Sequence, residues 1–131
     1  MTKRTTILAL VLVLGVGAGV VLAGNPEAKT KTVEGTLVDT KCYFADEANK
    51  SNDHGPMKGC GTACAKGGSP VGILTAQGKH YALVVPAPAV ADQVGQTVRA
   101  TGTAREGSFV PSKLEVKKGD TWQAVKLAGT M

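Results

Sequence analysis

The chain has 131 residues and a formal net charge of +5, and it contains three cysteines, two histidines and one tryptophan. That length fits one small domain. Aromatic residues make up only 4% of the chain, and its basic residues are scattered, so the sequence lacks the dense basic face with stacking rings that nucleic-acid binding requires.

The start of the chain has the features of a secretory signal peptide. Lys3 and Arg4 precede an unbroken apolar run, residues 7–23, which ends in small residues. We expect cleavage between Ala23 and Gly24. An uncleaved membrane anchor is the alternative, because the run approaches the about 20 residues that a spanning helix needs. Either way the domain is exported to the periplasm or the extracellular space, and only an uncleaved leader would attach it to a membrane.

The remainder divides into a polar linker, residues 24–31, and a folded domain, residues 32–131. Residues 32–44 are rich in valine, threonine and aromatic side chains, which is typical of a strand, and Cys42 falls at the end of this strand. Glycine inside a strand indicates a bulge or a sharp bend, which is what we expect at Gly35.

A short helix is predicted after the polar loop that follows. Pro56 suits the first turn, residues 57–66 form the body, and two glycines end it. In helical geometry Met57, Cys60 and Cys64 share one face. Glycines within the segment weaken a helix this short, so packing or bonding must hold it.

Further strands follow the helix. The expected segments are a hairpin of residues 72–75 and 80–85, a possible turn of helix in residues 86–91, strands over 95–106 and 108–119, and a last short strand within 120–129. Five short strands predict a small Greek-key barrel, for which the OB-fold is the best-known model at this size. Another open barrel or a small sandwich is the alternative. Large apolar residues are few, so a cross-link or a metal would matter for stability.

Several segments together resemble a group of small exported bacterial proteins with OB-like barrels. These are VEGTLVDTKC, then H-x5-C-x3-C, then GGSPVGILTAQGKHYALV and VGQTVRATGTA, and they span about residues 32–116. The most specific part is the order of the cysteines and the histidine ahead of Pro-Val-Gly. The resemblance implies a fold more than an activity.

The segment from Cys42 to Cys64 gathers the side chains suited to metal chemistry. Cys42, His54, Cys60 and Cys64 would form a tetrahedral Cys3His set, which suits zinc. Soft thiolates also suit copper(I), and the thioether of Met57 would favour copper slightly. Four protein ligands leave no open position, so we expect metal binding or transfer rather than catalysis.

Two other interpretations of the cysteines remain open. Cys42 bonded to Cys60 or Cys64 would tie strand to helix for about 2–4 kcal/mol and leave one thiol over. A Cys60–Cys64 bond would distort the helix, because residues four apart have Cβ atoms about 5–6 Å apart and a disulfide needs about 3.5–4.5 Å. The first alternative describes a disulfide-stapled binding module for a protein or small ligand. The second would be a thiol-redox protein that uses Cys60 and Cys64.

Overall fold

The computed structural model describes residues 29–127. The predicted leader, its cleavage point and most of the predicted linker lie outside the described residues. Among the residues described, no helix is long and apolar enough to cross a membrane.

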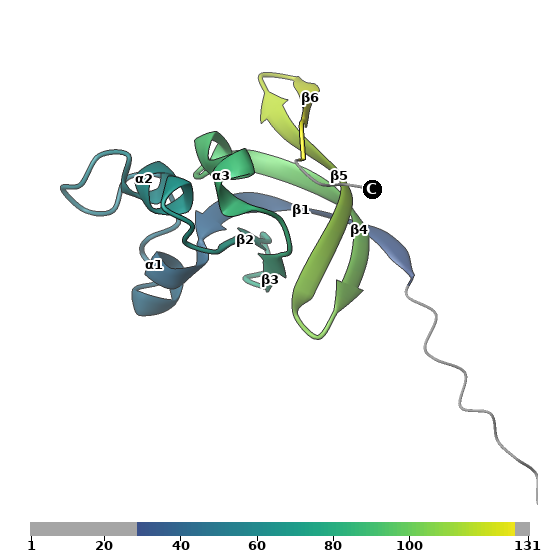
Figure 1. The fold of residues 1–131 in the computed structure, drawn as a ribbon, viewed down its shortest axis with the longest axis horizontal. Coiled ribbons are helices and arrows are strands. Elements are labelled where there is room, and N and C mark those ends of the chain that lie inside the picture. The colour runs from purple at the N-terminus through teal and green to yellow at the C-terminus, as the bar shows by residue number, and fades with distance from the viewer. Residues whose placement is uncertain (1–28, 128–131) are drawn as a thin grey trace, which may run out of the picture.

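The described chain forms a β-barrel with short helices (Figure 1). The strands are β1 (Thr30–Asp39), β2 (Val71–Leu74), β3 (His80–Leu83), β4 (Thr97–Arg105), β5 (Ser108–Lys118) and β6 (Thr121–Val125). β1 pairs antiparallel with both β2 and β4, β2 pairs with β3, and β4 pairs with β5. A parallel pairing of β3 with β5 closes the ring of five strands, and β6 extends the sheet from β5. The predicted five-stranded barrel is confirmed.

Apolar side chains fill the interior of the barrel. The largest fully buried ones are Phe109, Leu37, Ile73 and Leu114. In β4, Val98 and Ala100 are buried while their neighbours face outward, which confirms the predicted alternation. The helices α3 (Ala87–Val90) and η1 (Ala91–Gln93) join β3 to β4 and add Val90 and Ala91 to the same core.

β1 is the strand that connects the two halves of the barrel. Thr36 pairs with Thr97 of β4 and also with Leu74 of β2, so β1 changes partner at this point. A Cβ atom on Gly35 would lie only 2.3 Å from the carbonyl oxygen of Leu74. The pairing of β1 with β4 continues in register through Gly35, so this glycine permits a close backbone approach rather than a bulge.

The strand predicted over residues 32–44 is too long at its C-terminal end. β1 ends at Asp39, and the helix α1 (Thr40–Ala45) follows directly. The physical reason is a helix cap: Asp39 has an extended backbone, and its Oδ1 accepts a hydrogen bond from the backbone N–H of Cys42 at 2.9 Å. Cys42 therefore lies in a helix and not at the end of a strand.

The second predicted helix is confirmed for its two cysteines but begins later than expected. α2 spans Cys60–Lys66, and the residue before it, Gly59, has a φ of +66°, a conformation that glycine adopts without strain. Residues 57–59 are thus outside the helix, and the prediction that Met57 shares a helical face with the cysteines is wrong. α1, α2 and the loop between them gather at the far end of β1, away from β6 (Figure 1).

Candidate metal centre

The two short helices bring all three cysteines together. Cys42 comes from α1, and Cys60 and Cys64 come from α2. Their three Sγ atoms lie within 4.8 Å of one another, and those of Cys60 and Cys64 are 4.0 Å apart. Each residue is partly buried.

These distances match a metal site better than a cross-link. With Zn–S bonds of about 2.3 Å, sulfurs around a tetrahedral ion lie about 3.8 Å apart, close to the observed spacing. A disulfide needs about 2.05 Å. All three cysteines are free in this structure, so a disulfide between Cys42 and Cys60 or Cys64 stays a prediction.

Close packing holds α2 against the barrel despite its glycines. A Cβ atom on Gly61 would lie 2.6 Å from Cγ1 of Val94, so only glycine lets the helix approach this near. Ala65, one turn further on, is fully buried in the main core. Thr62 also donates from its hydroxyl to the carbonyl of Ala91 at 3.2 Å. The expectation that packing must stabilise this helix therefore has a specific structural basis.

The loop before α2 supplies partners for the first backbone N–H groups of the helix. The side chain of Asn52 accepts from the N–H of Thr62 at 2.7 Å, and the carbonyl of Asn52 accepts from the N–H of Gly61 at 2.9 Å. Asp53 Oδ1 accepts from the N–H of Gly59 at 2.8 Å. Sequence reasoning missed Asn52, because capping from ten residues away leaves no local signal.

Aromatic packing fixes α1 in a similar way. Tyr43 is buried with Val38 and Leu74, and its ring stacks on His80 with centroids 5.8 Å apart. His80 lies over Gly72, where a Cβ atom would come within 2.1 Å of the imidazole Nε2. His80 thus serves packing.

The protein disfavours the thiolate forms of Cys42 and Cys60 when no metal is bound, because it raises the pKa of both. Burial, followed by the negative charge of Asp39 and then by the other two cysteines, raises the pKa of Cys42 from 9.0 to about 11. Burial and the hydrogen bond with Cys64 likewise raise the pKa of Cys60. A bound cation would reverse this effect, because metals bind thiolates and displace the protons.

Asp39 is a site residue that the sequence analysis missed. It is fully buried, its Oδ1 caps α1, and its Oδ2 has no hydrogen-bond partner. Aspartate is a common N-cap residue, so Asp39 is a sequence signal for the start of a helix. This signal was overlooked because the residues before Asp39 have the composition of a strand.

The structure does not bring His54 into the group of ligand atoms that lie within 4.8 Å of one another. The imidazole is only 5% exposed; its Nε2 donates to the carbonyl of Ser51 at 3.1 Å, and its Nδ1 is buried without a partner. His54 as fourth ligand stays a prediction. Met57 pairs with His54 through backbone hydrogen bonds, and its side chain is 58% exposed.

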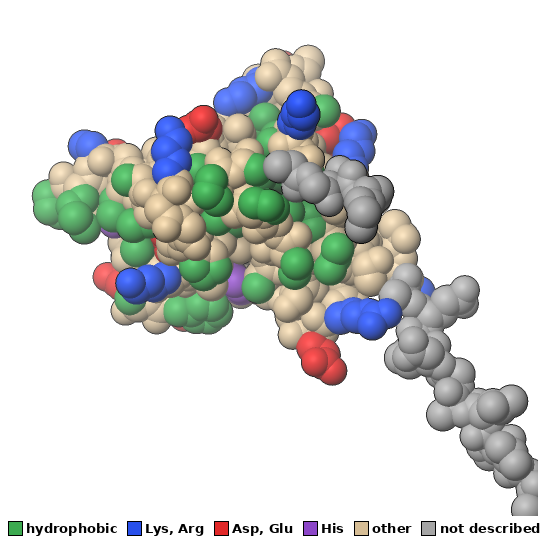
Figure 2. Space-filling view, in the orientation of Figure 1, with side chains coloured by type: hydrophobic (Ala, Val, Ile, Leu, Met, Phe, Trp, Pro, Cys, Tyr) green, Lys and Arg blue, Asp and Glu red, His purple; other side chains and the backbone are tan. Residues whose placement is uncertain are grey.

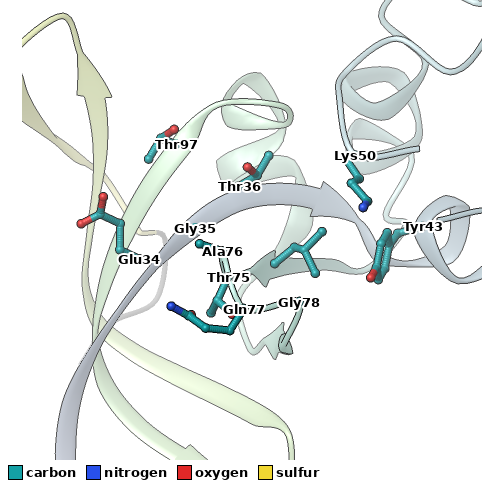
Figure 3. Close-up of a pocket in the computed structure, with 11 residues that line it drawn as sticks. Glu34, Gly35, Thr36, Tyr43, Lys50, Thr75, Ala76, Gln77, Gly78 and Thr97 are labelled. Carbon is teal, nitrogen blue, oxygen red and sulfur yellow. The ribbon is translucent and has the colours of Figure 1, made fainter. Parts of the chain in front are cut away.

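A separate hollow of about 580 Å³ lies along the outside of β1 and over the turn between β2 and β3 (Figure 3). Tyr43 and Lys50 stand at one end of it and Glu34 at the other, with short polar side chains and backbone between them. No cysteine lines this hollow, so it is distinct from the sulfur cluster.

Comparisons with protein-family models, with curated proteins and with solved structures found no match to this chain. The resemblance to small exported OB-like proteins therefore stays a prediction that depends on the segments quoted above.

Proposed function

We propose that this protein is exported and binds a soft transition-metal ion, zinc or copper(I), through Cys42, Cys60 and Cys64. The observation that carries the proposal is the convergence of three Sγ atoms within 4.8 Å. Cys60 and Cys64 lie 18 and 22 positions after Cys42, so this convergence is a product of the fold. In an oxidising compartment, a bound metal would also protect three adjacent thiols from random oxidation.

The coordination number distinguishes the two metals. Copper(I) is satisfied by three thiolates, whereas zinc in structural sites is almost always four-coordinate. The argument for copper from Met57 loses its basis, because that side chain is outside α2 and largely exposed. Zinc would need a fourth ligand besides the three sulfurs. His54, whose buried Nδ1 has no hydrogen-bond partner in the described structure, is the candidate that the sequence predicts.

The proposed role is binding or transfer of the ion rather than catalysis. Four protein ligands around zinc, or three thiolates around copper(I), leave no position at which a substrate could be activated. The cysteines are only partly buried, which gives a partner or a small chelator access to the ion.

A binding module of OB type is the second candidate, and the hollow along β1 is the observation that favours it. The insertion with the two cysteine helices lies between β1 and β2, one of the loop regions that OB-folds use for ligands. In this alternative a disulfide would replace the metal.

Elemental analysis of the purified full chain, together with a count of free thiols after denaturation, tests the proposal. We expect one zinc or copper per chain, three thiols after metal removal, and loss of the metal in Cys42→Ser and in Cys64→Ser. Ser112→Ala, on the barrel and exposed, is the control and should keep the metal. A single free thiol in the wild type, or no metal after exposure to either ion, would refute a three-thiolate site.

A further inference from the structure

In the part of the chain that the structure describes, the buried side chains with unsatisfied polar atoms lie in one stretch, residues 39–69, which contains the three cysteines. Among the described residues, three buried side-chain atoms lack a hydrogen-bond partner: Asp39 Oδ2, His54 Nδ1 and Ser69 Oγ. Buried polar atoms are normally paired, so such exceptions point to a ligand or an ordered water. Within the described residues, no such atom belongs to β2–β6, so the deficit is local to the proposed metal site.

Asp39 is the most anomalous of the three. Its side chain is fully buried, and none of the ion pairs found among the described residues involves it. A buried carboxylate without a cation is strongly unfavourable, so a carboxylate in this position is expected to have a positive partner. The described protein supplies no such cation.

The hydrogen bond that Asp39 makes fixes its carboxylate in space and so indicates where a positively charged partner would lie. Oδ1 is fixed to the backbone N–H of Cys42 at 2.9 Å, which holds the carboxylate at the first turn of α1, beside the thiols. The charge of Asp39 acts on two of the three thiols, because it contributes to the raised pKa of both Cys42 and Cys60. The carboxylate therefore lies next to the cysteine cluster. Its oxygens, like the His54 nitrogens, are not among the ligand atoms that lie within 4.8 Å of one another, so Oδ2 would have to turn towards the sulfurs to reach the same ion.

We propose that Asp39 is the fourth ligand of the metal through Oδ2, and that the site is consequently a Cys3Asp site with preference for a zinc-like dication over copper(I). This inference rests on the proposed function and deepens it. Carboxylate oxygen is a regular zinc ligand, whereas copper(I) favours sulfur. Three thiolates and one carboxylate carry four formal negative charges, of which a dication neutralises two and copper(I) only one.

The other two unpartnered atoms fit this position less well. His54 is tied to its own loop by the bond to Ser51 and by the backbone bridge to Met57, and no hydrogen bond found among the described residues links it to α1 or α2. Ser69 follows α2, and its neutral hydroxyl is a weaker ligand than a carboxylate.

The test compares Asp39→Asn with Asp120→Asn, which makes the same chemical change at an exposed carboxylate in the turn between β5 and β6. Asparagine is as good a helix cap as aspartate, so α1 should be retained. Competition with chromophoric chelators should show zinc affinity reduced at least about tenfold in Asp39→Asn and copper(I) affinity changed less than about threefold. Asp120→Asn should behave as the wild type. Equal zinc affinity in Asp39→Asn and the wild type would overturn the inference and leave the three-thiolate site intact.

X-ray absorption of the zinc-loaded wild type tests the ligand without any variant. We expect three sulfur neighbours at about 2.3 Å and one oxygen at about 2.0–2.2 Å, with no outer-shell scattering from an imidazole. Imidazole scattering that disappears in His54→Ala would assign the fourth position to His54 and overturn the inference. Failure of the wild type to bind any metal would overturn both this inference and the proposed function.

Discussion

Two buried carboxylates distinguish the two ends of this molecule. Glu115 on the barrel is 8% exposed and bonds to both Arg99 and Lys113 at 2.8 Å. Asp39 at the cysteine end is fully buried, and no cation pairs with it among the described residues. The barrel therefore pairs its buried carboxylate with cationic side chains of its own. The cysteine end, in contrast, carries a carboxylate and polar atoms that would gain a partner if a metal ion bound there.

The same contrast holds for the packing. The barrel core is a continuous apolar cluster that includes Phe109, Leu37 and Ile73. At the cysteine end two helices of six and seven residues depend on contacts with other elements, because helices of this length do not persist alone. Figure 2 shows the result on one face, where apolar side chains remain on the surface of this end. Stability is thus expected to reside in the barrel, and metal affinity in the placement of the helices.

The largest effect on stability should follow from a cavity in the barrel. Phe109→Ala removes the largest fully buried side chain and should lower the free energy of unfolding by about 3–5 kcal/mol. Urea unfolding of the metal-free protein measures this. Val110→Ala, which changes an exposed neighbour, should cost less than about 0.5 kcal/mol. A loss below 1 kcal/mol in Phe109→Ala would contradict a barrel-centred stability.

A medium effect should follow at the junction between the barrel and α1. The added methyl group of Gly72→Ala would collide with the ring of His80 at 2.1 Å and displace it from Tyr43, at a cost of about 1–3 kcal/mol. Thermal unfolding measures the cost, and zinc titration should show weaker binding because α1 carries Cys42. In a His80→Ala background the same substitution should cost less. An equal cost in both backgrounds would locate the strain elsewhere.

The smallest effect concerns alkaline pH. The pKa of Cys42 is about 11 in the folded protein and 9.0 in an unstructured chain, so the folded state holds this proton more tightly. Its contribution to stability is complete below pH 9 and is lost as pH rises towards 11. The metal-free protein should therefore unfold at lower urea concentration at pH 10.5 than at pH 8.5, by a modest amount because the thiol is partly solvated.

Cys42→Ser is the control for this pH dependence and should weaken it, whereas Ser112→Ala should not. A midpoint of unfolding that is constant or rises over this interval would show that the thiol is not destabilised as a thiolate in the folded state.

Part of the architecture was predictable because its signals are local. The alternation of Val98 and Ala100 with polar neighbours indicated β4, and the Gly-Gly pair after Lys66 indicated the end of α2. The change from strand to helix at Asp39 was not predictable from composition, because Thr40, Tyr43 and Phe44 of α1 are also residues typical of strands. There a single capping hydrogen bond outweighs strand propensity.

The sequence by itself indicated that the three thiols of one segment are the side chains best suited to metal or redox chemistry, since residue type alone sets softness and nucleophilicity. Tertiary structure alone decided which side chains meet. It joined Cys42 to Cys60 and Cys64, left Met57 on the surface, and placed Asp39 in the interior beside the thiols. The physical reason is that these meetings depend on the close packing of α2 against Val94 and of α1 against His80, and such contacts have no period or motif along the chain.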